Sequence, residues 1–219
     1  LRSVTIPTTV TLIDTGAFGG CSLLTSVRLG AGVKELKSTV FANCESLTSF
    51  TIPATLTAVS PEAFSGCDNL DRFLLEDGST SFTEKDGVIY TVNWEIALFP
   101  VTKTEYTIPK EVVSLPENFF KDYSITSISV EEGNTAFQAI GGVLYDAAMT
   151  KIIYFGDSVT EYEIPATLPS GMTEEEFFEV LLGATNLKYI TVAAGNTAYQ
   201  AKFGAVYDMD WNLLVFPMG

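Results

Sequence analysis

The chain has 219 residues, 47% of them hydrophobic and 18% charged, a composition that predicts a packed, water-soluble protein and argues against disorder. Its 12 basic and 27 acidic residues give a net charge of −15, which excludes binders of duplex nucleic acid or of anionic membranes, because both need clustered lysine and arginine. Basic protein patches and cations are the partners that this charge favours. No run of 18 apolar residues is present, so no membrane-spanning helix is expected.

The first 69 residues repeat one pattern three times, with a period of 23 residues. A fixed period in this range is typical of proteins built from stacked coils, in which each coil contacts only its neighbours. The phenylalanines and cysteines at this spacing are Phe18, Phe41 and Phe64, and Cys21, Cys44 and Cys67. The repeat predicts a solenoid.

Each short repeat is expected to form one coil. In the first, Val4-Thr5-Ile6 alternates as a short strand does when one of its faces is buried. Pro7 lacks a backbone N–H and ends the strand. Val10 and Ile13 return the chain along the other side, and a helical turn carries Phe18. Alone, one coil cannot bury its apolar residues, so the coils must stack.

The three cysteines do not form a disulfide framework, because their number is odd and their spacing is that of the repeat. We expect a column of buried thiols that act as small hydrophobic side chains. A metal site is not expected, since tetrahedral sites usually draw on Cys-x-x-Cys pairs or histidine and the sequence has neither.

After Leu70 the period lengthens but persists. Each long repeat has a strand, then a glycine and an aromatic residue, and then a pair of apolar segments that we interpret as an inserted β-hairpin. The strand positions are Phe73/Leu75, Ile128/Val130 and Ile190/Val192; the hairpin segments are 87–90 with 96–99, 142–145 with 152–155, and 204–207 with 213–216. Near-identical copies, EGNTAFQA at 132–139 and AGNTAYQA at 194–201, precede the last two hairpins.

Two segments carry helix-start signals. Ser60-Pro61-Glu62 places an N-cap residue before proline at the first helical position. Thr173, with Glu176 three residues later, forms a capping-box pattern, and Gly183 is expected to end that helix.

We interpret residues 1–219 as a single solenoid, with three short repeats over 1–69 and three long repeats over 70–219. The last repeat breaks off where another return strand is due, which suggests a fragment or an open coil covered by something else. No export signal is present, so any such signal has been removed or never existed.

The patterns LxxVxIPxxVxxIxxxAFxxC at 1–21 and LTSFTIPATLTAVSPEAFSGCDNL at 47–70 resemble the BspA-like leucine-rich repeat, and the GVLYD…TKIIYF elements resemble hairpin insertions in bacterial surface proteins of that family. The resemblance covers essentially the whole chain. It implies a mainly β, right-handed leucine-rich-repeat solenoid with short helical turns, in a secreted or surface-anchored protein. It also implies adhesion and the binding of host or bacterial proteins, with no common catalytic residues.

The absence of histidine excludes hydrolytic triads of the Ser-His and Cys-His types. Paired carboxylates at Glu76-Asp77, Glu131-Glu132 and Glu174–Glu176 are expected in solvated turns or at a helix start. Asp208-x-Asp210 could offer oxygens to calcium, but it lacks the glycine and distal glutamate of an EF-hand loop, so a hairpin turn is favoured. No catalytic residue, cofactor or metal is predicted.

The strand face that points away from the core is the expected recognition surface. Two columns run along it: Ser3, Ser26, Ser49, Arg72, Ser127 and Tyr189, and Thr5, Arg28, Thr51, Leu74, Ser129 and Thr191. Arg28, Arg72, Leu74 and Tyr189 stand out as interface anchors among small hydroxyl residues. The alternative is a β-surface without a binding role.

The hairpin turns carry a second candidate set: Trp94, Met149 and Trp211, large apolar residues where a turn should be polar. Exposed, Trp94 and Trp211 would form stacking platforms for sugar or protein. We favour the alternative, that these side chains fold back onto the neighbouring hairpin and extend the core.

Together these features predict a non-enzymatic, extracellular or cell-surface binding and adhesion module. Its ligand is expected to be a host or bacterial surface protein, or less favourably a glycan. The rival hypothesis is a structural stalk that displays another domain.

Overall fold

The computed structural model describes residues 1–116 and 119–216. These residues form a mainly β solenoid, as the repeat predicts, with one α-helix. They divide into two compact units, which we describe separately: unit 1 (residues 1–103 and 114–119) and unit 2 (residues 104–113 and 120–219). A single solenoid across both units stays a prediction.

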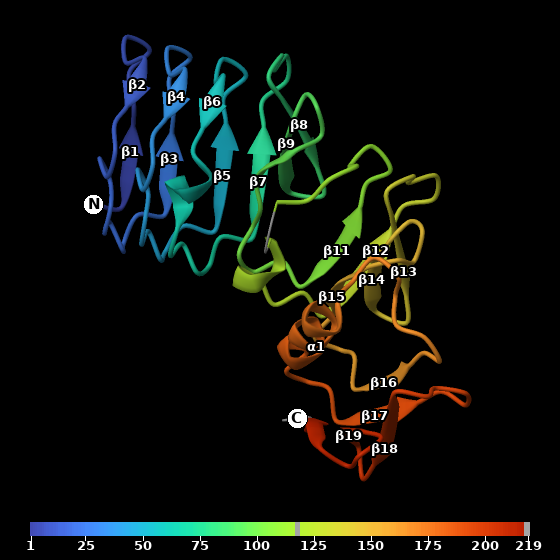
Figure 1. Cartoon of the computed structure of the whole chain (residues 1–219). Helices are drawn as coiled ribbons and strands as arrows, with labels where there is room; N and C mark the ends of the chain where they lie inside the picture. The colour runs from blue at the N-terminus through green and yellow to red at the C-terminus, as the bar shows by residue number, and fades with distance from the viewer. Residues whose placement is uncertain (117–118, 217–219) are drawn as a thin grey trace. The chain divides into compact units, whose positions relative to one another are not determined.

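Parallel strands form one side of unit 1, side by side in Figure 1. They are β1 (Ser3–Thr5), β3 (Ser26–Arg28), β5 (Ser49–Ile52) and β7 (Arg72–Leu75). Strand β1 pairs with β3 and β5 pairs with β7, each in a register set by the 23-residue period, such as Ser3 with Ser26. Phe50 and Phe73, the central inward residues of the second pair, are buried.

The predicted return segments form a second ladder of unit 1. Strands β2 (Leu12–Ile13), β4 (Glu35–Leu36) and β6 (Ala58–Val59) pair in parallel, with Ile13 opposite Leu36 and Leu36 opposite Val59. The first two coils are therefore hydrogen-bonded to each other through both ladders, by β1 with β3 and by β2 with β4.

The predicted phenylalanine column is confirmed. The rings of Phe18 and Phe41 lie 5.4 Å apart and 8° from parallel, and those of Phe41 and Phe64 lie 5.5 Å apart at 18°. Burying one such ring contributes about 1.5–3 kcal/mol. The column fixes the register of the three coils.

The cysteines are free thiols beside this column: Cys44 and Cys67 are buried, as expected, whereas Cys21 is only partly buried. Cys44 Sγ donates to the carbonyl oxygen of Phe18 at 3.4 Å, and Cys67 Sγ donates to that of Phe41 at 3.1 Å. Burial raises the pKa of Cys44, and it raises the pKa of Cys67 to about 12. Both thiols therefore remain protonated and serve packing.

The predicted helical turns are only partly helical. The Phe18 segment forms hydrogen-bonded turns, in which Ala17 N–H donates to Asp14 O at 3.1 Å, and the third short repeat forms a 3₁₀ turn, η1 (Pro61–Phe64). Ser60 precedes η1, but its hydroxyl lies 2.9 Å from the Glu62 carboxylate and does not accept a backbone N–H. Ser60 therefore stands at the predicted N-cap position, but the capping hydrogen bond to a backbone N–H is absent.

Each long repeat contains a three-stranded antiparallel sheet, where the sequence predicted a two-stranded hairpin. The sheets are β8 (Phe82–Lys85), β9 (Val88–Thr91) and β10 (Ile96–Leu98) in unit 1, and β13 (Phe137–Ile140), β14 (Val143–Asp146), β15 (Ile152–Phe155), β18 (Tyr199–Lys202), β19 (Ala205–Asp208) and β20 (Leu213–Val215) in unit 2. The additional strand starts at the aromatic residue of each repeat.

Two consecutive residues with positive φ join the first two strands of each sheet. The angles are 56° and 79° at Asp86-Gly87, 59° and 83° at Gly141-Gly142, and 54° and 79° at Phe203-Gly204. This is the type I′ turn, whose twist matches that of the flanking strands.

In unit 2, parallel strands again precede each sheet. Strand β11 (Glu105–Ile108) pairs with β12 (Ser127–Val130), and β16 (Glu161–Ile164) pairs with β17 (Tyr189–Val192). The short-repeat pattern resumes here, as the sequence predicted.

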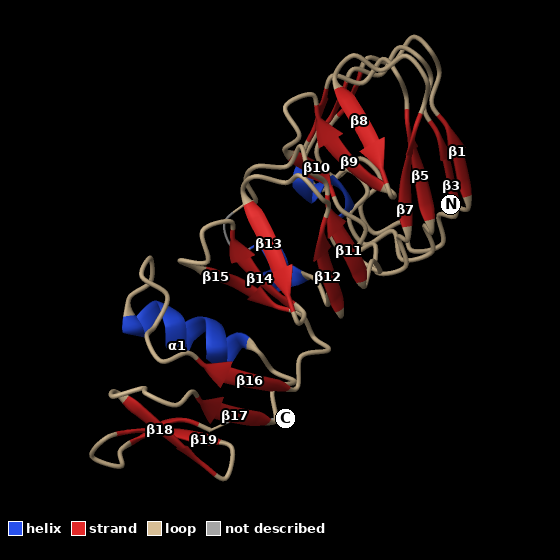
Figure 2. Ribbon diagram, turned by 90° about the vertical axis from the view of Figure 1, so that its right-hand side faces the viewer, coloured by secondary structure: helices blue, strands red, loops and turns tan. Residues whose placement is uncertain are grey.

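Helix α1 (Glu174–Gly183) has the predicted capping box, in which Glu176 N–H donates to Thr173 Oγ1 at 3.2 Å. Gly183 is its last residue and Ala184 is the C-cap, so the helix ends at the predicted glycine. Phe177 and Leu181 are buried, and α1 packs against β15, beside the sheet seen in Figure 2. A further 3₁₀ turn, η2, spans Phe119–Asp122.

Candidate functional site

The outward residues of the parallel strands in unit 1 are exposed, as predicted. Arg28, Arg72 and Leu74 project from β3 and β7, and Leu74 is 46% exposed. Arg72 Nη2 lies 3.1 Å from Asp71 Oδ2, an exposed ion pair that contributes little to stability. A shallow hollow of about 210 Å³ lies on this face. It is lined by Thr48, Ser49, Asp71, Arg72 and Leu74.

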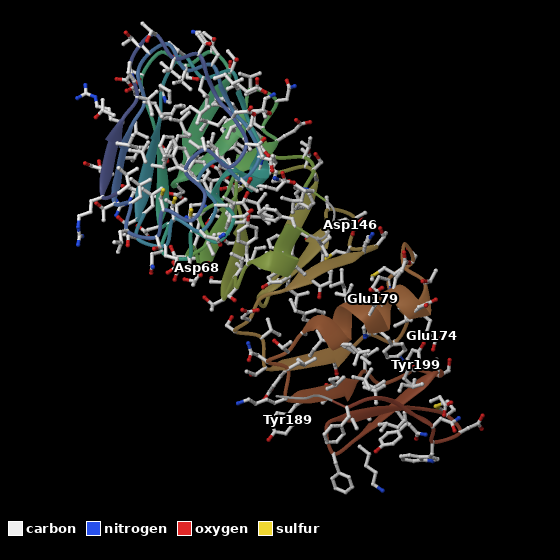
Figure 3. The ribbon with its side chains drawn as sticks, turned by 90° about the vertical axis from the view of Figure 1, so that its left-hand side faces the viewer. Asp68, Asp146, Glu174, Glu179, Tyr189 and Tyr199 are labelled. Atoms are coloured by element: carbon white, nitrogen blue, oxygen red, sulfur yellow. The ribbon has the colours of Figure 1, made fainter. Side chains whose placement is uncertain are left out.

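Unit 2 presents the same kind of face. Tyr189 on β17 is 59% exposed and projects from the ribbon in Figure 3. Opposite it in the ladder is Glu161, and Glu163 is opposite Thr191. On the other strand pair, Glu105 is opposite Ser127, and the hydroxyls of Thr107 and Ser129 lie 2.8 Å apart.

Sequence reasoning missed Glu105, Thr107, Glu161 and Glu163 as members of this face. The sequence contained the signal for these strands, because EYTI at 105–108 and EYEI at 161–164 alternate between polar and apolar residues as the strands of unit 1 do. The two predicted columns of outward residues, however, included only one strand from each long repeat. With these residues included, the faces differ in charge: unit 1 presents Arg28 and Arg72, and unit 2 presents three glutamates.

The large residues of the hairpin turns all have left-handed backbone conformations, with φ of 61° at Trp94, 58° at Met149 and 65° at Trp211. Trp94 packs 5.3 Å from Tyr90, and Trp211 packs 5.5 Å from the equivalent tyrosine, Tyr207. Each tryptophan therefore contacts its own hairpin, whereas the sequence favoured contact with a neighbouring hairpin.

The third hairpin is the most exposed of the three. Trp211 is 55% exposed and Phe203 is 89% exposed, and Lys202 Nζ lies 5.5 Å and 5.4 Å from the centroids of these two rings. A binding role for Trp94 and Trp211 stays a prediction.

Several carboxylates of the predicted acidic pairs accept hydrogen bonds from backbone N–H groups. Glu76 accepts a hydrogen bond from Ala54 N–H at 3.3 Å, and Glu131 accepts one from Lys110 N–H at 2.9 Å. Asp208 accepts from Asp210 N–H at 3.0 Å and from Asn212 N–H at 2.8 Å, which is the hairpin-turn role that the sequence favoured. In the described part of the chain no three acidic or cysteine side chains form a metal-binding group.

The repeated GNTA motif is structural. Asn134 Oδ1 accepts from the N–H groups of Ala136 and Phe137, both at 2.8 Å, and its amide nitrogen donates to the carbonyl oxygens of Pro109 and Val112 at 2.8 Å and 2.9 Å. Asn196 makes the equivalent bonds to Ala198, Tyr199 and Pro165. The motif joins the first strand of the sheet to the preceding coil.

Unit 2 also contains a groove of about 410 Å³ between the β14–β15 turn and the segment after β16. The phenols of Tyr145 and Tyr162 are hydrogen-bonded to each other, and burial raises the pKa of both, so both stay neutral at physiological pH. The described residues that line this groove, which we call the tyrosine groove, are Tyr145, Ala148, Met149, Thr150, Tyr162, Glu163, Pro165, Thr167, Leu168, Pro169 and Ser170.

The 23-residue coils of unit 1 stack Phe18, Phe41 and Phe64 in one column. The model of the BspA type leucine rich repeat region matches residues 1–86, in 6 copies. Residues 1–86 are therefore similar to the BspA-type leucine-rich repeat. Parallel strand pairs occur in unit 2 as well, between β11 and β12 and between β16 and β17.

One solved structure supports this fold assignment. The pneumococcal vaccine antigen PcpA aligns with 93% of this chain and 53% of its own, at 20% identity and a TM-score of 0.57. A leucine rich cell surface protein from Faecalibacterium prausnitzii A2-165 aligns with 89% of this chain and 60% of its own, at 21% identity and a TM-score of 0.48. The chain thus spans about half the length of the antigen, and the likeness concerns the fold.

A comparison with curated proteins finds none that matches this sequence. Of the helices in the described residues, none has the length and apolar character needed to cross a membrane.

Proposed function

We propose that this BspA-type protein is a non-enzymatic, extracellular binding module that engages a protein ligand through the outward faces of its parallel strands. The observation that carries the proposal is the placement of Arg72, Leu74 and Tyr189, large exposed side chains among small hydroxyl residues on strands whose backbones are already paired. Small neighbours let a partner approach closely, and arginine and tyrosine are common interface anchors.

The proposed location outside the cell rests on the resemblance to BspA-like surface proteins. A non-enzymatic role agrees with the repeat class and with the structural roles that the described acidic turns already have.

The test is a binding screen of the purified chain against a panel of host and bacterial surface proteins by biolayer interferometry. For a captured protein, we expect the double variant Arg72→Ala/Tyr189→Ala to raise the Kd at least about 10-fold, which is about 1.4 kcal/mol. The two single variants assign the effect to unit 1 or unit 2. Ser26→Ala/Ser127→Ala, at small residues on the same column, is the matched control and should change the Kd less than 2-fold, roughly the noise of such contacts.

Melting temperatures of all variants should stay close to that of the wild type, because these side chains are exposed. Unchanged binding by the double variant would remove this face from the recognition surface. Binding only to a glycan array would contradict the proposed ligand class.

A further inference from the structure

The type I′ turn of the third sheet contacts the outward face of unit 2. A Cβ at Gly204 would lie 3.7 Å from both the Cα and the Cδ1 of Tyr189, which Figure 3 labels. In unit 1 the equivalent glycine, Gly87, lies beside Arg72 in the same way, and a Cβ there would be 3.2 Å from the Arg72 Cβ. The surfaces that carry Tyr189 and Arg72 therefore continue onto these turns.

The fold does not explain why the other central residue of this turn is a phenylalanine. Phe203 has a φ of 54°, a conformation that is unfavourable for a bulky residue, and its side chain is almost fully exposed. The equivalent turns hold Asp86 and Gly141, residue types that suit this geometry. Backbone strain of this kind is found mostly where function requires it. The strain therefore indicates that the ring has a role outside the fold.

The exposure of Phe203 belongs to the turn and does not result from its position in the third long repeat. Asp86 and Gly141 are exposed as well, although further coils follow both of them. The position of Trp211 behaves similarly, since its equivalent Met149 is also exposed.

A lysine joins the exposed rings. Lys202 Nζ lies over both of them, 5.4 Å from the centroid of Phe203 and 5.5 Å from that of Trp211. No carboxylate of the described residues pairs with this ammonium group. Tyr189, Lys202, Phe203 and Trp211, which we call the Phe203 patch, thus combine exposed rings with an available cation.

These features favour a protein over a sugar as the occupant of the patch. A sugar stacks on an accessible ring face, and Lys202 already lies over one face of each ring. A ring that projects from a turn fits a concave apolar pocket, as interface anchors do. The ammonium group then needs an acceptor of opposite charge. Because the net charge of −15 repels a broadly acidic surface, a single carboxylate at the rim of the pocket suits the patch best.

We propose that Phe203 inserts into an apolar pocket of the protein ligand and that Lys202 binds a carboxylate at the rim of that pocket. Tyr189 and Trp211 pack on the apolar surface around the pocket. This inference rests on the proposed function, and it extends the recognition surface from the strands to the turn of the third sheet.

The first test uses a host molecule with the proposed chemistry. β-Cyclodextrin has an apolar cavity that admits a phenyl ring, and its mono-carboxymethyl derivative adds one carboxylate at the rim. The whole chain, labelled with ¹⁵N-phenylalanine, is titrated with each host. We expect a saturable shift of the Phe203 N–H signal and none at buried Phe73. The carboxylated host should bind at least about 3-fold more tightly, in the range of an exposed charge pair.

Two lysine variants separate a specific contact from general charge attraction. Lys202→Gln should make the two hosts bind equally. Lys110→Gln, at an exposed lysine of unit 2 outside the patch, should retain the preference for the carboxylated host.

The second test uses a protein captured in the surface-protein screen. Phe203→Asn should raise its Kd at least about 10-fold, whereas Met209→Ala, at an exposed residue outside the patch, should change it less than about 2-fold. Because asparagine tolerates a positive φ, Phe203→Asn should resist urea at least as well as the wild type. Misfolding would then not account for the lost binding.

An unmoved Phe203 signal, equal binding of the two hosts by the wild type, or a captured protein that binds Phe203→Asn as tightly as the wild type would each overturn the inference. In the last case, weaker binding by Arg72→Ala/Tyr189→Ala would leave the proposed function standing. If no protein binds the chain, the proposed function is wrong and this inference fails with it, whatever the hosts do.

Discussion

Phe203 shows how one residue can depart from the pattern of its repeat. The equivalent positions of the other two type I′ turns hold Asp86 and Gly141, residue types that tolerate a positive φ, but here a phenylalanine has a φ of 54° and is 89% exposed. A bulky residue in this conformation is strained and gains almost nothing from burial.

We therefore expect Phe203→Asp to raise the free energy of unfolding by about 0.5–1 kcal/mol, measured by urea denaturation. Phe203→Ala is the control: it removes the ring but keeps the Cβ that is unfavourable at this φ, so it should recover less of the gain. Equal gains from both variants would assign the effect to the exposed ring instead of the backbone.

The phenol of Tyr199 should contribute to the pH dependence of stability at alkaline pH, and a single substitution tests this contribution. Burial, with a hydrogen bond to the Glu174 carboxylate beside it in Figure 3, raises the pKa of Tyr199 to about 12. Because the folded-state pKa exceeds the ordinary value of about 10, the folded protein holds the proton more tightly. This stabilisation is complete below pH 10 and is lost as the pH rises through 12.

The variant Tyr199→Phe should therefore lose less stability than the wild type between pH 10 and pH 12, as measured by denaturation at each pH. Some loss should remain, since burial also raises the pKa values of Tyr154 and Tyr162. A Tyr199→Phe profile identical to that of the wild type would contradict the assignment.

At the scale of the element, the GNTA motif shows why a verbatim repeat need not be a binding site. Its asparagine satisfies four backbone groups from two segments, so the residue is set by hydrogen bonding within the coil.

Asn134→Ala should lower the free energy of unfolding by about 2–4 kcal/mol, since it leaves several partly buried backbone groups without partners. Asn134→Asp retains the accepting oxygen but loses both donors, so its loss should be smaller than that of the alanine variant. Thermal and urea denaturation measure both. A loss below about 1 kcal/mol for Asn134→Ala would show that water replaces the side chain.

The elements that the sequence predicted well are those with strong periodicity. The 23-residue period placed the strands of unit 1, the phenylalanine column and the buried thiols, and the Thr173–Glu176 pattern placed the helix. The first strand of each sheet was missed because FTEK, FQAI and YQAK are only four residues long and share no common alternation of polar and apolar residues. Their pairing is set by the type I′ turn and by strands elsewhere in the sheet.

The candidate surface was predicted in part, for a similar reason. Alternation within strands identified Arg28, Arg72, Leu74 and Tyr189 as exposed. The tyrosine groove was not predicted, because it depends on which coil segments face each other and on the absence of a strand after Pro169. Spacing along one strand does not contain that information.

At the scale of the whole molecule, the account combines an acidic protein with outward faces of different charge. Twenty-seven acidic residues against 12 basic ones should make binding of a basic ligand weaken as salt rises, in proportion to the exposed charges involved. A kinetic comparison at 50 and 500 mM salt should show the larger change in the association rate, because long-range attraction acts before contact.

The central claim is that the paired strands hold the fold while their outward side chains bind a protein. Hydrogen-exchange mass spectrometry of the complex with a captured ligand tests it most directly. The account predicts that the ligand protects the peptides that contain β7, β12, β16 and β17, and leaves the peptides around Phe18, Phe41 and Phe64 unchanged. Protection of the phenylalanine turns, with the strand peptides unaffected, would contradict it.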